Sequence, residues 1–196
     1  KYLAEQVFKK WQLKDKKNRS LVILRPTVIF GEGNRGNVYN LLRQIATKKF
    51  VMLGSGLNIK SIAYVENVAA FLEYNLKSKS GIHIYNYVDK PDLNMNTLIS
   101  FTRKTLFNNS NIGPRLPKFI GIIIGKLFDL LSFILKINFS ISSIRIKKFM
   151  SDSQFNSSNI HKTNFQAPVE ITTALVNTLT YEFLEDNSHE KVFNTE

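Results

Sequence analysis

One unbroken apolar run, Leu21-Val22-Ile23-Leu24, ends at Arg25-Pro26. Apolar residues without polar alternation are typical of a strand that is buried on both faces of a parallel sheet. Proline lacks an amide N–H and fixes φ, so such a strand must stop pairing at Pro26 and turn away. In open α/β sheets the backbone beyond such a strand faces a ligand at the carboxyl edge. The run therefore favours an α/β fold with a ligand site just past Pro26.

Helices and short strands alternate in the first half of the chain, and the second half is mostly helical. Helices are predicted over 1–17, 38–47, 66–76, 94–106, 117–136, 142–150 and 170–184, and strands over 21–24, 50–53, 61–65 and 82–85. This order predicts an α/β sheet with a helix-rich appendage. Residues 187–196 are predicted to form a frayed tail.

Local patterns give the first two helices more detail. Leu3, Val7 and Trp11 recur every four positions and predict an apolar stripe, and Glu5 is placed to pair with Lys9. Asn37 is placed to cap the helix that follows the glycine-rich loop 31–36.

Composition narrows the class of protein. The 196 residues contain no cysteine, which excludes a disulfide framework and thiolate catalysis, and the three histidines show no metal-ligand spacing. The net charge of +12 would suit nucleic acid, an anionic membrane or a phosphorylated substrate, or it reflects a Lys-rich composition alone. No nucleic-acid-binding motif accompanies the charge, so a nucleic-acid partner is not expected.

Several short motifs follow one another in a set order. Lys1 stands four positions before Glu5, and the strand ending in Arg25-Pro26 continues as Thr27-Val28-Ile29-Phe30-Gly31. Further on come Gly54-Ser55-Gly56, Val65-Glu66-Asn67-Val68 and Tyr85-Asn86. This order resembles the extended short-chain dehydrogenase/reductase family, which contains sugar-nucleotide epimerases and dehydratases. The resemblance implies the C-terminal part of a Rossmann-type doubly wound sheet with a helix-rich substrate-binding subdomain. Residues 1–90 would belong to the cofactor-binding domain interleaved with substrate-binding segments, and 91–186 would form the subdomain.

The resemblance also implies roles for particular residues. Lys1 would close a Tyr-x-x-x-Lys motif, hold the nicotinamide ribose of NAD and lower the pKa of the catalytic Tyr. Pro26, Thr27 and Val28 would line the nicotinamide. The candidate contacts to a diphosphate substrate are Arg35, Asn37, Val38, Lys60, Arg145 and Lys148. The family usually has Arg at position 60 and Asp at positions 61 and 67, where this chain has Lys60, Ser61 and Asn67, so the substrate is left open.

The activity implied is that of an NAD-dependent epimerase or dehydratase, in particular a 4-epimerase of a nucleotide- or lipid-diphospho-sugar in surface polysaccharide synthesis. Hydride would pass from C4 of the sugar to NAD and return to the other face. The catalytic Tyr and the glycine-rich cofactor loop would precede Lys1, so this chain alone is expected neither to bind NAD tightly nor to turn over. A homodimer in the cytoplasm, at the inner face of the membrane, is expected for the full-length form.

Two other interpretations remain open. In the first, the chain is a non-catalytic remnant or binding module of the same fold. Alternatively it would be a basic protein of the membrane surface, since 117–136 combines a narrow polar stripe with a wide apolar body. Such a helix either packs against its neighbours or lies in a membrane interface.

Overall fold

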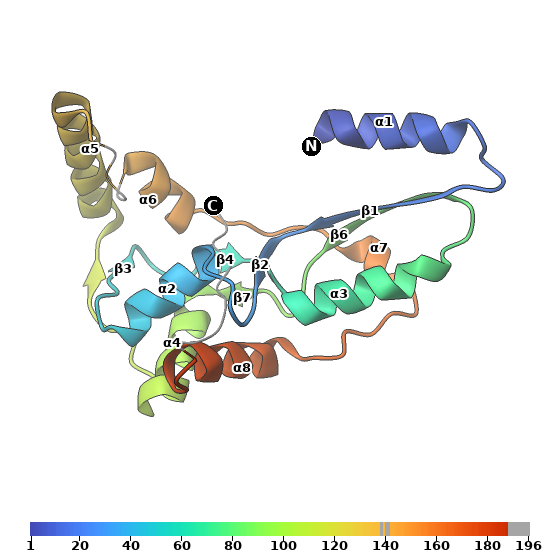
Figure 1. The fold of residues 1–196 in the computed structure, drawn as a ribbon. Coiled ribbons are helices and arrows are strands. Elements are labelled where there is room, and N and C mark those ends of the chain that lie inside the picture. The colour runs from blue at the N-terminus through green and yellow to red at the C-terminus, as the bar shows by residue number, and fades with distance from the viewer. Residues whose placement is uncertain (138, 140–141, 188–196) are drawn as a thin grey trace.

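A computed structural model describes residues 1–137, 139 and 142–187 (Figure 1). The helices are α1 (Tyr2–Leu13), α2 (Asn37–Ala46), α3 (Val65–Tyr74), α4 (Met95–Phe107), α5 (Lys118–Leu135), α6 (Ser143–Met150), α7 (Ser158–His161) and α8 (Ile171–Phe183), with a 3₁₀ turn at Asn75–Lys77. The strands are β1 (Ser20–Pro26), β2 (Val28–Phe30), β3 (Met52–Leu53), β4 (Ile59–Lys60), β5 (Ile62–Tyr64), β6 (Gly81–Tyr87), β7 (Leu93–Asn94) and β8 (Arg115–Leu116).

The longest strand pairing is parallel and joins β1 to β6. Its register runs from Ser20 opposite Gly81 to Pro26 opposite Tyr87. β2 and β5 form a second parallel pair directly beyond it, while β3 pairs with β8 in parallel and β4 with β7 in antiparallel fashion. Parallel strands joined through helices confirm the predicted α/β fold.

Three apolar clusters hold the elements together. The largest contains Phe30, Leu42, Leu98 and Leu175, and so joins β2, α2, α4 and α8. A second centres on Met52 and packs the turn after α2 against α4. The third surrounds Phe71 of α3 on the face of β6, with Tyr87 and Phe165 at ring-centroid distances of 5.3 and 4.9 Å. Segments from both halves of the sequence share all three of these clusters.

A buried polar network fixes the carboxyl end of β6. The Asp89 carboxylate accepts hydrogen bonds from the Tyr64 backbone N–H (2.6 Å) and the Asn67 amide (3.0 Å). Asn67 in turn donates to the Val169 carbonyl (2.8 Å) and accepts from the Val169 N–H (3.0 Å). Buried polar groups are costly unless paired, so this network determines how α3, β6 and the chain before α8 meet.

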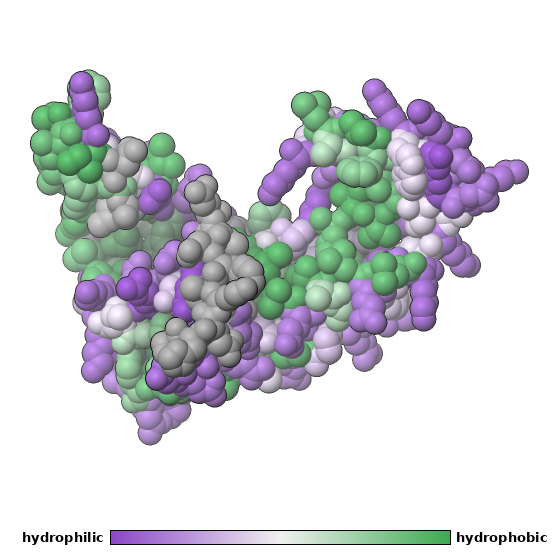
Figure 2. All heavy atoms as spheres, in the orientation of Figure 1, coloured by the Kyte–Doolittle hydropathy of each residue, from purple (hydrophilic) through white to green (hydrophobic). Residues whose placement is uncertain are grey.

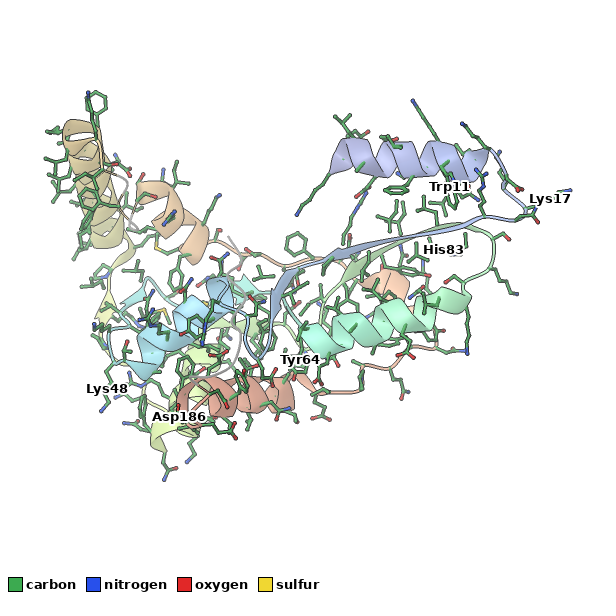
Figure 3. All side chains as sticks on the ribbon, viewed as in Figure 1. Trp11, Lys17, Lys48, Tyr64, His83 and Asp186 are labelled. Atoms are coloured by element: carbon green, nitrogen blue, oxygen red, sulfur yellow. The ribbon has the colours of Figure 1, made fainter. Side chains whose placement is uncertain are left out.

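α1 is held on β1 by polar contacts. Glu5 forms a bidentate ion pair with Arg25, the residue before Pro26. At the other end of α1, the Gln12 amide donates to the Arg19 carbonyl (3.1 Å), and the Arg19 guanidinium donates to the Trp11 carbonyl (2.6 Å). Figure 3 shows Trp11 on the side of α1 that faces the strands. The prediction that Glu5 would pair with Lys9 missed this contact, because Arg25 is distant in sequence.

Helix ends differ from the predictions where side chains compete for the backbone. The first helix was expected to reach residue 17 but ends at Leu13, and Asp15 accepts from the Asn18 backbone and amide (3.3 and 3.1 Å) in the turn that follows. Asn37 does not cap α2: Gly36 is the N-cap, and Asn37 is the first helical residue. α3 starts at Val65, one residue earlier than predicted.

One burial prediction was wrong, that of the run 21–24. The apolar stripe of Leu3, Val7 and Trp11 is exposed, and the buried residue of α1 is Gln12. Of the run 21–24 only Ile23 is buried, because β1 pairs with β6 alone among the described residues.

The predicted strands at 50–53 and 61–65 are shorter in the structure, at Met52–Leu53 and Ile62–Tyr64, whereas α4, α5, α6 and α8 agree with their predictions to within one residue at each end. No helix in the described part of the chain is both long and apolar enough to cross a membrane. The predicted tail lies outside the described residues except for Asn187, and the predicted division at residue 90 stays a prediction.

Replacement of Asn67 by alanine tests the buried network. The Asn67→Ala variant leaves the Val169 N–H without an acceptor and removes one of the hydrogen bonds to Asp89. The free energy of unfolding, measured by urea denaturation, should therefore fall by about 2–4 kcal/mol. The matched control is Glu66→Ala, which alters an exposed neighbour on the same helix and should change stability by less than about 0.5 kcal/mol. Equal losses in both variants would contradict the network's role.

Candidate functional site

The carboxyl edge of β1 and β6 brings together residues 26–28. The Thr27 N–H donates to the Tyr87 carbonyl at 3.1 Å, and this bond continues the strand pairing one residue beyond Pro26. Pro26 and Val28 are exposed on either side of Thr27. The Thr27 hydroxyl oxygen is buried, yet within the described residues it has no hydrogen-bond partner. A buried hydroxyl without a partner at this edge is suited to form a hydrogen bond with a polar group of a ligand.

A pocket of about 420 Å³ opens just past the end of β6. It is lined by Lys90, Gln154, Phe155, Asn156, Ser157, Ser158 and His161. Lys90 forms an ion pair with Asp92, and the Gln154 amide donates to the same carboxylate (2.9 Å). Burial alone would raise the pKa of Asp92, but hydrogen bonds from Lys90, Gln154 and Ser61 outweigh burial and lower it. Asp92 therefore stays ionised and orients two of the polar side chains at the pocket.

Sequence reasoning missed this pocket. Lys90 follows β6 by three residues. Its position after the carboxyl end of a parallel strand was the one feature of the sequence that could have indicated a ligand site there. No comparable signal pointed to Gln154 or Asn156, whose segment reaches β6 through a bond from the Asn86 amide to the Asn156 carbonyl (3.2 Å). A second pocket, of about 920 Å³, lies beside the end of α3 and the first half of β6, away from that edge.

Lys60 is engaged by the chain that follows α6. Its ammonium donates to the carbonyls of Lys148 (2.9 Å) and Ser151 (2.6 Å), and to the Ser153 hydroxyl (3.5 Å). Burial lowers the pKa of Lys60. Since an ammonium has three protons, these contacts use its whole donor capacity. Lys60 therefore joins β4 to the C-terminus of α6, where its positive charge also suits the helix dipole.

Arg145 and Lys148 are exposed on α6, one turn apart. Because Lys60 binds the Lys148 carbonyl, the structure brings Lys60, Arg145 and Lys148 into one neighbourhood.

Arg35, Asn37 and Val38 lie elsewhere, at the start of α2. Arg35 pairs with Glu182 of α8, and its guanidinium lies 4.2 Å from the centroid of the Tyr39 ring. Glu182 also accepts from the Gly33 N–H at 2.8 Å, so this carboxylate anchors the loop before α2 to α8. The Val38 side chain is in the core, which leaves only its backbone for a ligand, whereas Asn37 is exposed.

Lys1 is exposed at the start of α1. α1 runs opposite to β1, so its first residue points toward the carboxyl edge of the strand (Figure 1). The Glu5–Arg25 ion pair fixes this direction, because Arg25 adjoins Pro26. Lys1 and residues 26–28 therefore approach the same edge, while the metal-ligating residue types form no cluster of three in the described ranges.

Comparison with known proteins shows what this chain resembles. The family model of the 3-beta hydroxysteroid dehydrogenase/isomerase family matches residues 1–73. The chain is 46% identical, over its whole length, to the N-acetyl-alpha-D-glucosaminyl-diphospho-ditrans,octacis-undecaprenol 4-epimerase of Escherichia coli O157:H7. Both matches support the resemblance to the extended short-chain dehydrogenase/reductase family that the sequence motifs predicted. It spans 59% of the length of this curated relative.

Solved structures of two sugar-nucleotide epimerases share the fold. UDP-glucose 4-epimerase from Bifidobacterium longum, in complex with NAD+ and UDP, superposes with a TM-score of 0.59 at 13% identity, over 95% of this chain and 54% of that protein. UDP-N-acetylglucosamine 4-epimerase from Bacillus cereus gives 0.57 at 14% identity, over 85% and 48%. These matches confirm the predicted Rossmann-type architecture. The roles assigned to single residues stay predictions.

The pH dependence of stability tests the environment of the Asp89 carboxyl at the carboxyl edge of the sheet. Burial raises its pKa above the ordinary 3.8, against the lowering effect of hydrogen bonds from Tyr64, Tyr87 and Asn67. Because the folded protein holds this proton more tightly than the unfolded chain does, Asp89's contribution to stability is full below pH 3.8 and falls as pH rises through the raised pKa.

The difference in unfolding free energy between the wild type and Asp89→Asn should therefore decrease as pH rises from about 4 toward neutrality. Urea denaturation of both proteins across this range measures it. A difference that grows with pH would mean that the fold lowers the pKa of Asp89.

Proposed function

We propose that this chain is the C-terminal portion of an NAD-dependent 4-epimerase that acts on a diphospho-sugar, with a lipid-diphospho-sugar of surface polysaccharide synthesis as the preferred substrate. The observation that carries the proposal is the 46% identity, over the whole chain, to an epimerase whose name gives an undecaprenol-diphospho-sugar substrate. The positions at which Lys60, Ser61 and Asn67 replace the family's usual residues fall inside this matched region.

The residues present at the carboxyl edge fit a nicotinamide cofactor. NAD, when bound, would accept and return the hydride at C4 of the sugar. The buried Thr27 hydroxyl needs a hydrogen-bond partner, and Pro26 and Val28 present exposed apolar surface beside it. Lys1 would hold the ribose and, by its positive charge, lower the pKa of a neighbouring catalytic phenol. With the glycine-rich loop and this phenol placed before Lys1, the 196 residues alone would be inactive.

The diphosphate would bind at two groups of the proposed contacts. Asn37 and Val38 would offer backbone N–H groups at the positive end of α2. Arg145 and Lys148 would supply cations from α6. Lys60 would act as a positioning residue, since its ammonium is occupied with carbonyls at the end of α6. Arg35 would bind phosphate only by sharing its guanidinium with Glu182.

The full-length form would be a cytoplasmic homodimer that works at the inner face of the membrane. The exposed apolar stripe of Leu3, Val7 and Trp11 supports the presence of a protein-binding surface on α1. A non-catalytic remnant or binding module is the alternative, and measured turnover separates it from an enzyme.

The Lys1→Met change tests the catalytic assignment in the protein that carries this chain. Loss of the charge beside the catalytic phenol should lower kcat by about 10² or more, with a smaller effect on KM, because general-base catalysis contributes about 10²–10⁴. Lys10→Met removes an exposed charge from the same helix and should leave kcat within about twofold. Equal kcat for Lys1→Met and wild type would refute the role of Lys1.

A further inference from the structure

α5 turns its apolar side away from the protein. The most exposed large side chain of α5 is Phe133, at 83%, and Phe119, Ile123, Leu127, Leu130 and Ile134 are also exposed. At 100° per residue these five fall within a sector of about 80°. Figure 2 shows hydrophobic residues gathered over α5, which stands out from the rest of the molecule in Figure 1. A continuous apolar face of this kind is unusual on a surface that meets only water.

The polar side of α5 faces α6 instead. The Asp129 carboxylate accepts from the Ser143 N–H at 3.2 and 3.3 Å, at the start of α6, and the Ser132 hydroxyl donates to the Ile137 carbonyl (2.6 Å). Gly125 permits the close approach, since a Cβ there would lie 2.7 Å from Ser143 Cα. This arrangement is the reverse of a water-soluble amphipathic helix, whose apolar side faces the protein.

Positive charge is concentrated in the segment that contains the apolar face. Between positions 115 and 150 the sequence has seven basic residues and one acidic residue, Asp129, which gives +6, half of the whole chain's +12. The basic residues are exposed: Arg115, Lys118, Lys126, Lys136, Arg145, Lys147 and Lys148. Basic residues that flank an apolar helix face are the pattern of a helix that lies in the interface of an anionic membrane.

We propose that the hairpin of α5 and α6 is the membrane-binding element of this protein, with α5 lying in the headgroup region of an anionic bilayer. At 1.5 Å per residue its 18 residues extend about 27 Å along the surface. A second copy fits less well, because it would bring another +6 face against this one. The inference deepens the proposed function, on which it rests for the choice of a lipid surface: an enzyme on a bilayer meets a lipid-linked sugar where that sugar is held.

Vesicle co-sedimentation of the purified protein tests the proposal. The protein should bind vesicles of phosphatidylcholine mixed with phosphatidylglycerol more strongly than vesicles of phosphatidylcholine alone, and added salt should weaken the preference. Absence of binding to the anionic vesicles would overturn the proposal. So would an oligomer in solution that Leu127→Glu/Leu130→Glu dissociates while no vesicle binding is seen.

The double variant Leu127→Glu/Leu130→Glu has a matched control. Leu127 and Leu130 are 55% and 54% exposed, and Leu72 and Leu76, near the end of α3, are 48% and 83% exposed. Leu127→Glu/Leu130→Glu should lower vesicle partitioning by about tenfold or more, because carboxylates are costly in the acyl region. Leu72→Glu/Leu76→Glu should bind like the wild type. Equal binding by the first variant, or an equal loss in the second, would overturn the proposal.

A fluorescence measurement covers the case in which the charged variant does not fold. Trp11 is the single tryptophan of these 196 residues, so Trp11→Phe/Phe133→Trp moves their one indole to α5. Brominated phospholipids in the anionic vesicles should quench this indole, and an unquenched indole on sedimented protein would overturn the proposal.

Turnover of detergent-dispersed substrate separates this proposal from the proposed function. In the protein that carries this chain, Leu127→Glu/Leu130→Glu should retain wild-type turnover of that dispersed substrate. If the wild type binds vesicles but neither it nor the variants turn over substrate, only the proposed function is refuted. If the wild type turns over substrate but does not bind vesicles, only the proposed membrane-binding element is refuted.

Discussion

The arrangement of the carboxyl edge depends on one buried carboxylate. Asp89 accepts from the Tyr64 N–H, the Tyr87 hydroxyl and the Asn67 amide, and through Asn67 it reaches the chain before α8. Burial makes each of these bonds costly to leave unmade, so the elements cannot shift independently. Thr27 and the pocket beside Lys90 lie directly beyond this point, which gives the proposed cofactor and substrate groups a rigid base.

Ion pairs then attach the outer elements to this base. Glu5–Arg25 sets the direction of α1 on β1, and Arg35–Glu182 holds the loop before α2 on α8. Lys60 ties the end of α6 to β4. Because α6 also packs against Gly121 and Gly125 of α5, the same contacts connect the exposed apolar face of α5 to the site. A bilayer bound at α5 would therefore hold the site at a defined distance from the lipid.

Local patterns in the sequence predicted much of this fold and less of the site. The apolar run before Pro26 and the helical periodicities depend on neighbours a few residues apart, and the elements they predicted are present. The partners of Glu5, Arg35 and Lys60 lie 20 to 147 residues away, and no local pattern indicates them. The exposure of Leu3, Val7 and Phe133 was equally out of reach, since periodicity shows that a face is apolar and does not show what covers it.

The most direct test of the account is a comparison of two substrates. The purified protein that carries this chain, supplied with NAD, would be assayed for C4 epimerisation of N-acetylglucosaminyl-diphospho-undecaprenol and of UDP-N-acetylglucosamine. An epimerase of lipid-linked sugars should show a kcat/KM at least about tenfold higher for the lipid-linked sugar, a difference of about 1.4 kcal/mol in transition-state stabilisation. Conversion of the nucleotide-linked sugar alone, or of neither, would contradict the proposed function.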